Sequence, residues 1–237
     1  MMIKTETIEY RDGGATLEGV LVHSDSARRK CPGVVVVPEW YGVGAYSIKR
    51  AQMLAELGYV AFVADVYGKG IRPNNPTDAA AEAGKYYGDR ALLRSRGSAA
   101  LDVLRNHQSC NAEKLAAIGY CFGGTAVLEL ARSGADVAGV VSFHGGLGTP
   151  TPARSIKSTV LVLHGADDPI VPAAEVLAFE QEMRDANVDW QLVSYGGAVH
   201  SFTNWELTTP NSTGVAYNEK ADKRSWLAMQ AFLAEIL

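Results

Sequence analysis

Residues 115–124, Leu115-Ala116-Ala117-Ile118-Gly119-Tyr120-Cys121-Phe122-Gly123-Gly124, are the stretch that decides the fold. They begin as a short apolar run that predicts a buried strand, and the residues that follow, up to 132, have the pattern of a helix. Gly-x-Cys-x-Gly between a strand and a helix is the cysteine form of the nucleophile elbow, a strained turn that lifts a nucleophile above a sheet. Glycines suit such a turn because its backbone leaves little room for side chains. The stretch therefore predicts an α/β fold in which Cys121 is a nucleophile.

Strands and helices alternate from residue 33 onward, which is typical of a doubly wound, mostly parallel sheet with helices on both faces. We expect strands at 5–10, 17–23, 34–37, 59–64, 115–118, 139–143, 160–164 and 192–195. We expect helices at 47–57, 77–108, 122–132, 172–186 and 218–237, with Ser47 as the N-cap of the first, breaks at Gly84 and Gly88 in the second and Pro172 in the first turn of the fourth. No linker, repeat or shift of composition divides the chain, so we predict a single α/β domain over residues 1–237, without a separate cap domain.

Composition narrows the classes of function. The chain has 237 residues, 47% of them hydrophobic, and a net charge of −4 from 22 basic and 26 acidic residues. Because no block of Lys and Arg appears, we expect neither a nucleic acid nor a membrane surface as a partner. No signal peptide and no apolar run of about 18 residues is present, so a cytoplasmic protein is expected.

Three cysteines, Cys31, Cys110 and Cys121, are odd in number and lack the CxxC spacing of a zinc site. We therefore expect no disulfide framework, no metal site and no cofactor. A monomer or a weak homo-oligomer is expected.

Chemically active side chains gather at the predicted carboxyl ends of the strands, where α/β folds place their ligands. Reading these ends in chain order gives Glu39-Trp40, Asp65, Cys121, His144, Asp167-Asp168 and His200. A nucleophile, then an acid, then a histidine is the chain order of the α/β-hydrolase triad. The residue types leave Asp167 and Asp168 as alternatives for the acid.

These residue types suit nucleophilic catalysis. A cysteine at a helix N-terminus lies at the positive end of the helix dipole, which stabilises the thiolate. The His200 imidazole can take the thiol proton, and a carboxylate on its other ring nitrogen fixes the tautomer. The backbone N–H groups of Phe122 and Trp40 are our candidates for an oxyanion hole.

Four motifs resemble the dienelactone hydrolase family of the α/β-hydrolase superfamily over nearly the whole chain. They are Gly119-Tyr120-Cys121-Phe122-Gly123-Gly124, Pro38-Glu39-Trp40-Tyr41-Gly42, Gly165-x-x-Asp168-x-x-Val171-Pro172 and His200-Ser201-Phe202. The resemblance implies that Cys121 is the nucleophile, Asp168 the triad acid and His200 the base. It also implies that Glu39 contacts the thiol and takes part in its activation by substrate.

The resemblance implies a hydrolase that cleaves an enol-lactone or an activated carboxylic ester. The family's type enzymes bind a substrate carboxylate with arginines, and Arg72, Arg90, Arg94 and Arg96 are candidates here. We expect substrate contacts from Tyr41, His144, Phe202, Arg90 and Arg94, although Tyr41 and Phe202, like Trp40, fit a pocket wall and the core equally well. The alternatives are a carboxylesterase of broader specificity and a non-hydrolytic member that senses oxidants or binds a ligand.

Overall fold

The strand that leads to the elbow, β5 (Cys110–Tyr120), also contains the boundary between two compact units, 1–118 and 119–237. The structure is a computed structural model that describes residues 2–25, 29–154 and 156–237. The predicted strand was shorter because the first half of β5 carries exposed polar side chains, which hide the strand from a search for apolar runs.

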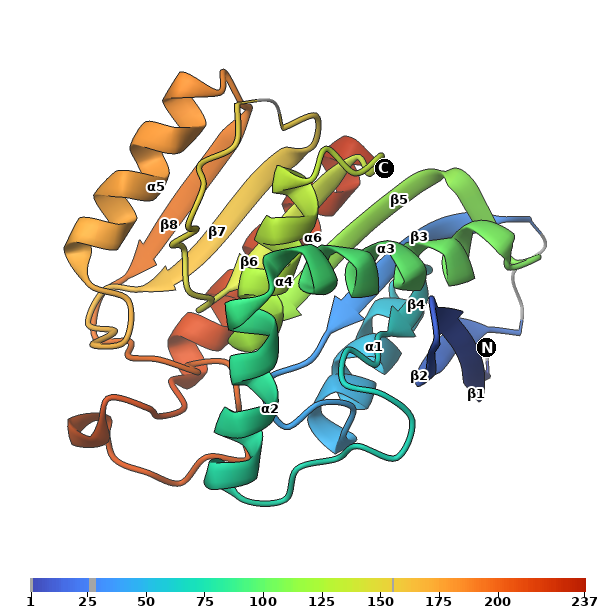
Figure 1. The fold of residues 1–237 in the computed structure, drawn as a ribbon, viewed down its shortest axis with the longest axis horizontal. Coiled ribbons are helices and arrows are strands. Elements are labelled where there is room, and N and C mark those ends of the chain that lie inside the picture. Colours follow the sequence, from blue (N-terminus) through green and yellow to red (C-terminus); the bar gives the residue numbers. More distant parts are fainter. Residues whose placement is uncertain (1, 26–28, 155) are drawn as a thin grey trace. The chain divides into compact units, whose positions relative to one another are not determined.

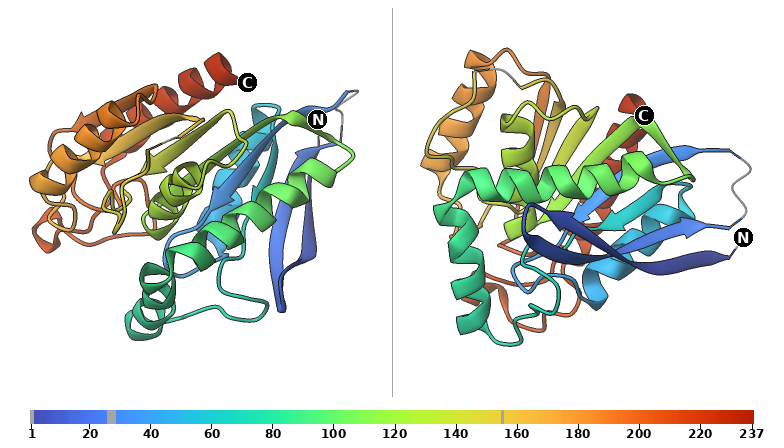
Figure 2. Two further views of the ribbon diagram at one scale, coloured as in Figure 1. Left: turned by 45° about the horizontal axis from the view of Figure 1, so that its top comes forward. Right: turned by 45° about the vertical axis from the view of Figure 1, so that its right-hand side comes forward.

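The first unit starts with a hairpin of β1 (Ile3–Asp12) and β2 (Ala15–Ser24), whose antiparallel register pairs Asp12 with Ala15 (Figure 2). Gly13, in the two-residue turn, has φ 56°, which glycine adopts without strain. The strands predicted at 5–10 and 17–23 are confirmed.

A mostly parallel arrangement follows the hairpin. In this unit the strands are ordered β1-β2-β4-β3-β5; β2 pairs antiparallel with β4 (Val60–Val63), and β4 pairs parallel with β3 (Cys31–Val37). Residues 33–37 of β3 are all buried, because α1 (Ala45–Glu56) and α3 (Arg90–Asn106) pack on the strands. The predicted buried strand at 34–37 is confirmed.

Helix α1 begins earlier than predicted. Its N-cap is Gly44, and Ser47 is the third residue of the helix rather than the N-cap. The Ser47 hydroxyl accepts a hydrogen bond from Gly44 N–H (3.2 Å) and donates one to the Gly44 carbonyl (3.0 Å). Serine stabilises a helix start from either place, which explains the error of three residues.

The long helical segment breaks once, where α2 (Pro76–Gly88) meets α3 at a sharp bend (Figure 1). The Asp89 carboxylate caps α3 by accepting a hydrogen bond from Leu92 N–H (2.9 Å). The predicted break at Gly84 is wrong, because Gly84 lies inside α2.

The second unit matches the predicted order. It contains α4 (Phe122–Arg132), β6 (Gly139–Phe143), β7 (Thr159–Gly165), α5 (Ala173–Asp185), β8 (Trp190–Tyr195), a short 3₁₀ turn (Asn211–Thr213) and α6 (Glu219–Ile236). Strands β6, β7 and β8 pair in parallel, and α5 runs alongside β8 (Figure 1). Pro172 stands at the N-cap of α5 rather than in its first turn. The single-domain organisation over residues 1–237 stays a prediction.

Every residue of α4, the helix after the elbow, is buried, including two charged ones. Arg132 Nη2 lies 2.7 Å from Glu182 Oε2 on α5, and Arg132 Nη1 lies 3.2 Å from Glu129 Oε1. Arg132 Nη2 also donates to the Leu147 carbonyl (2.7 Å), and Ala153 N–H donates to Glu182 (2.9 Å). This buried network, Glu129-Arg132-Glu182, joins α4, α5 and the connection between β6 and β7.

Candidate active site

Cys121 occupies a strained turn between β5 and α4. Its backbone has φ 53° and ψ −114°, a combination rarely adopted by residues with a side chain. A Cβ atom added at Gly119 would lie 1.9 Å from the Gly123 carbonyl oxygen, and one at Gly124 would lie 2.6 Å from Ser142 Oγ. The glycines are therefore needed for the turn to close and for α4 to approach β6.

His200 bridges the thiol and a carboxylate within the second unit. Its Nε2 lies 3.1 Å from Cys121 Sγ, and its Nδ1 lies 2.8 Å from Asp168 Oδ2. Asp167, the alternative acid, is exposed and accepts a hydrogen bond from Gly197 N–H (3.1 Å). Of the two neighbouring aspartates, Asp168 is therefore the one that contacts His200.

The loops after β7 and β8 hold the acid and the base in place. Asp168 Oδ1 accepts hydrogen bonds from Ile170 N–H (2.8 Å) and Val171 N–H (3.3 Å), which leaves Oδ2 for His200. The backbone N–H of His200 donates to the Gly214 carbonyl (3.1 Å), and the His200 backbone forms an isolated β-bridge with Val215. Both side chains are buried, so neither can rotate freely away from the other.

The charge of the pair depends on Cys121. Burial by itself lowers the pKa of His200, but the thiolate charge of Cys121, the hydrogen bonds to Asp168 and Cys121 and the charge of Asp168 outweigh it and raise the pKa to about 10. A thiolate and an imidazolium thus stabilise each other in this geometry. Chemically, a thiolate beside an imidazolium can act as a nucleophile next to a proton donor.

His144, at the end of β6, lies beside this pair. Its Nδ1 accepts a hydrogen bond from Cys121 N–H (3.1 Å), and its Nε2 lies 2.7 Å from Thr203 Oγ1. The ring packs edge-on against His200 and Phe202, with centroid distances of 5.5 and 5.2 Å. The sequence proposed His144 as a pocket-lining residue and did not indicate Thr203, because nothing in the residue pattern links positions so far apart in the chain.

The matching family model covers residues 17–237 and describes the dienelactone hydrolase family. The chain belongs to the dienelactone hydrolase family. A solved dienelactone hydrolase-like promiscuous phosphotriesterase from metagenomic libraries is 39% identical, with a TM-score of 0.94 over 100% of this chain and 99% of its own. A probable 2-oxo-3-(5-oxofuran-2-ylidene)propanoate lactonase of Bradyrhizobium is 27% identical over 85% of this chain and 86% of its own length. A carboxymethylenebutenolidase homolog of Mus musculus is 26% identical, covering 82% of this chain and 80% of its own length.

These likenesses give this dienelactone hydrolase family member the α/β-hydrolase fold with a mostly parallel sheet, as predicted. Together with the lactonase and the carboxymethylenebutenolidase homolog, they make it a dienelactone hydrolase-like hydrolase. The resemblance stated from the motifs is confirmed.

Apart from Phe122 and Phe202, the remaining predicted site residues of this family member belong to the first unit. Glu39, Trp40 and Tyr41 follow β3 in a turn closed by a hydrogen bond from Gly42 N–H to the Glu39 carbonyl (2.9 Å). Tyr67 Oη donates to the Trp40 carbonyl (2.7 Å), and the Tyr41 ring packs edge-on against the Trp40 ring. Their roles, like that of Phe202, which is fully buried in the second unit, stay predictions.

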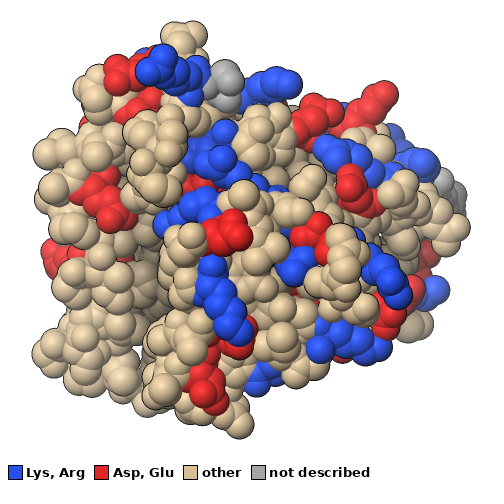
Figure 3. Space-filling model, in the orientation of Figure 1, with Lys and Arg blue, Asp and Glu red and all other residues tan. Residues whose placement is uncertain are grey.

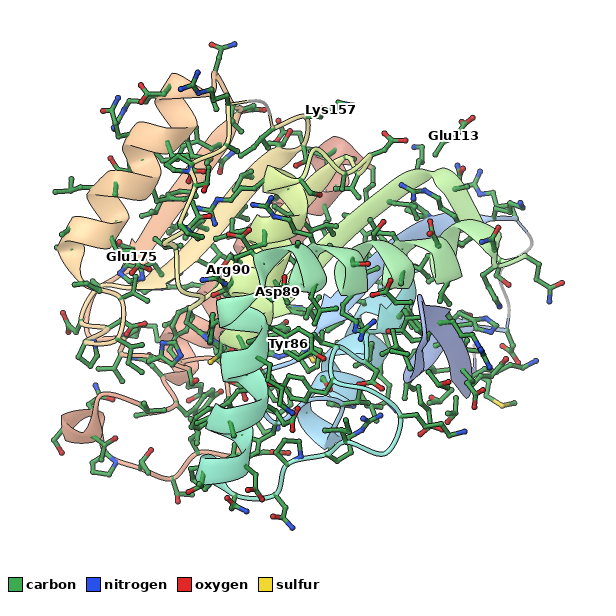
Figure 4. The ribbon with its side chains drawn as sticks, viewed as in Figure 1. Tyr86, Asp89, Arg90, Glu113, Lys157 and Glu175 are labelled. Atoms are coloured by element: carbon green, nitrogen blue, oxygen red, sulfur yellow. The ribbon has the colours of Figure 1, made fainter. Side chains whose placement is uncertain are left out.

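The candidate arginines of the first unit differ in the hydrogen bonds and ion pairs that their side chains form. Arg96 Nη1 pairs with Asp12 at 2.5 Å, and Arg72 bonds to Asp65 (3.3 Å) and to three backbone carbonyls. Arg90 lies where α2 meets α3, with Tyr86 and Asp89 (Figure 4). Its Nε and Nη1 are buried and have no hydrogen-bond partner among the described residues.

Basic and acidic side chains are interspersed over α2 and α3 on the face drawn in Figure 3. Within the described ranges, no group of three or more His, Cys, Asp or Glu side chains could hold a metal ion. In the same ranges, no helix has the length and apolar character that crossing a membrane requires.

Proposed function

We propose that this hydrolase cleaves enol-lactones or activated carboxylic esters with a Cys121-His200-Asp168 triad. The observation that carries the proposal is the position of His200, whose two ring nitrogens lie 3.1 Å from the Cys121 sulfur and 2.8 Å from the Asp168 carboxylate. This is the nucleophile–base–acid arrangement of acyl-transfer enzymes. The probable lactonase of Bradyrhizobium, similar over 85% of the chain, is consistent with a lactone substrate.

In the first half-reaction the Cys121 thiolate attacks the substrate carbonyl carbon and forms a C–S bond. The carbonyl oxygen becomes an oxyanion, for which the backbone N–H groups of Phe122 and Trp40 are our proposed hydrogen-bond donors. The intermediate collapses by breaking the bond between the carbonyl carbon and the leaving oxygen. The His200 imidazolium gives that oxygen its proton, and a thioester remains on Cys121.

The second half-reaction requires His200 as a base. Formation of the thioester removes the thiolate charge, which is the largest of the causes that raise the His200 pKa. Without the thiolate charge, the lowering effect of burial is less opposed, so the pKa of His200 falls. The imidazole, neutral after it has protonated the leaving group, can then accept a proton from water. Water adds to the thioester, the C–S bond breaks, and the acid product leaves with the thiolate and imidazolium restored.

The chemistry favours substrates with a stabilised leaving group. Thiolate is itself a good leaving group, so the tetrahedral intermediate from an unactivated alkyl ester tends to expel sulfur and revert. An enol leaves more readily than an alkoxide, which favours enol-lactones over simple esters. Glu39 is our proposed partner of the thiol in its activation, as the family resemblance implies.

Substitution of the nucleophile tests the triad directly. Cys121→Ala and His200→Ala should each lower the turnover of an activated ester by at least about 10³-fold, because in the proposed mechanism Cys121 supplies the attack and His200 the proton transfer. Cys31→Ala, which changes a partly exposed cysteine of the first unit, should leave turnover unchanged. Retention of most activity by either triad variant would exclude this assignment.

An acidic substrate is favoured by Arg90. Two of its guanidinium nitrogens are buried without a hydrogen-bond partner among the described residues, and the guanidinium lies over the Tyr87 ring. A substrate carboxylate would supply the missing hydrogen bonds. Arg90→Gln should therefore raise KM about tenfold or more for a lactone that carries a carboxylate. KM for a neutral p-nitrophenyl ester should not change, and an equal rise for both substrates would contradict a role in binding carboxylate.

The substrate range has a broader alternative. The relative that is 39% identical over 100% of the chain is a promiscuous phosphotriesterase, which favours a permissive site. A panel of cis- and trans-dienelactones, p-nitrophenyl esters and a phosphotriester separates the possibilities by kcat/KM. A thiol sensor would instead give a sulfenic acid at Cys121 with peroxide and no acyl-enzyme in intact mass spectrometry. A cytoplasmic location and a monomeric or weakly homo-oligomeric state stay predictions.

A further inference from the structure

His144 is a buried histidine in an unusual backbone conformation. It follows directly on β6, has φ 41°, and exposes 1% of its surface. A positive φ is uncommon for a residue with a side chain and persists where surrounding contacts stabilise it. In His144 those contacts include hydrogen bonds at both ring nitrogens.

The hydrogen bonds of His144 define its tautomer. Cys121 N–H is a donor, so Nδ1, 3.1 Å away, must be the unprotonated nitrogen. The ring proton is then on Nε2, from which it is donated to Thr203 Oγ1 at 2.7 Å. Cys121 N–H also donates to the Phe143 carbonyl (3.0 Å), so the last residue of β6 and the residue after it share this N–H.

The two partners of His144 belong to the two segments that carry the reacting groups. Cys121 is the elbow residue, and Thr203, which is fully buried, comes three residues after His200. The turn between His200 and Thr203 is also tight, because Ser201 has φ 54°. One imidazole thus joins the backbone of the nucleophile to the loop of the base, while its ring packs edge-on against His200.

We propose that His144 is a positioning residue, which together with Thr203 fixes the distance between Cys121 Sγ and His200 Nε2. The proposal rests on the triad function above. It gives His144 a different role from the substrate contact expected from the sequence. Two occupied ring nitrogens and 1% exposure leave little of this side chain to meet a substrate.

Loss of this positioning should change kcat rather than KM. A shift of about 1 Å between reacting groups costs roughly 10²-fold in rate, while substrate binding elsewhere in a site is unaffected. Breaking the link at Thr203 should therefore lower kcat and leave KM nearly unchanged. A residue that contacted the substrate would raise KM instead.

Thr203→Val and Thr203→Ser are the first test, because valine keeps the shape of threonine and serine keeps its hydroxyl. Thr203→Val should lower kcat by roughly tenfold with KM within about twofold, and Thr203→Ser should recover most of the loss. Thr151→Val, at an exposed threonine, is the matched control and should behave like the unmodified protein. An unchanged kcat in a folded Thr203→Val protein, or a rise in KM alone, would overturn the proposal.

A double-mutant cycle tests whether Thr203 acts through His144. Asn at 144 can still accept from Cys121 N–H but is too short to reach Thr203, so His144→Asn should lose about as much kcat as Thr203→Val. The double variant should lose no more than either single one, whereas additive losses would show independent roles and contradict the proposal.

Alkylation of Cys121 by iodoacetamide separates this inference from the proposed function, because it needs no turnover. The pH dependence of the alkylation rate should move in Thr203→Val and His144→Asn and return in Thr203→Ser. If Cys121→Ala kept its activity, the triad would fail whatever this profile showed. If the triad variants were inactive but the profile did not move, the role of His144 would fail by itself.

Discussion

At the scale of single residues, the proposed mechanism depends on the charge of the Cys121 thiolate. This charge raises the pKa of His200, and in the proposed mechanism acylation removes it. The same imidazole would then act as an acid while the thiolate is free and as a base once the thioester has formed.

A prediction about the protonation of His200 follows. In the free enzyme the imidazole should stay protonated through neutral pH and lose its proton near pH 10, since its pKa is raised to about 10. Cys121→Ala removes the thiolate and its hydrogen bond, so the pKa of His200 should fall. NMR titration of the imidazole in both proteins measures this change, and identical titrations would show that the thiolate is not the cause.

The residue types predicted the order of Cys121, the acid and His200, but not the choice between the two aspartates. Asp167 and Asp168 are chemically identical and adjacent, and they differ in direction, which the backbone after β7 decides. In the folded chain Asp168 accepts from two loop N–H groups and faces His200, while Asp167 faces Gly197. The contacts of His144 could not be predicted from the sequence either, because they depend on a positive φ and on a loop distant in sequence.

At the scale of elements, the predicted boundaries agree most closely with the structure for α4, which glycine-containing turns flank. Helix α4 has its predicted ends, because the elbow starts it and Gly134, with φ 75°, follows its end. The break predicted at Gly84 is wrong because a glycine inside a helix costs only about 1 kcal/mol relative to alanine and does not by itself end the helix. The capping carboxylate of Asp89 marks the true start of α3.

Helix α4 also supplies the prediction at this scale, through the buried network Glu129-Arg132-Glu182. Arg132→Met removes the cation that bridges the buried carboxylates of Glu129 and Glu182, which should cost about 3–5 kcal/mol of unfolding free energy. Arg184→Met, which breaks the exposed pair with Glu180 on α5, should cost at most about 1 kcal/mol. Urea denaturation of both variants measures the difference, and equal losses would show that burial of the Arg132 pair has no effect.

At the scale of the whole molecule, the question is whether the two compact units fold as one. Their boundary, after Ile118, lies inside β5 and not in a Gly-, Pro- or Ser-rich linker. Unfolding of either unit alone would have to disrupt a strand that continues into the other. The sequence predicted a single domain for a related reason, since no linker composition interrupts the chain.

Cooperative unfolding is therefore the expected behaviour of the whole chain. Trp40 lies in the first unit, and the other tryptophans, Trp190, Trp205 and Trp226, lie in the second. A variant that keeps Trp40 alone and a variant that keeps Trp190 alone report on one unit each, with phenylalanine at the other positions. In each variant the urea midpoint from tryptophan fluorescence should coincide with the midpoint from circular dichroism. Because both midpoints come from the same protein, destabilisation by the substitutions affects them equally. Two separate midpoints within one variant would instead show that the units are independent domains, joined by a strand whose halves unfold separately.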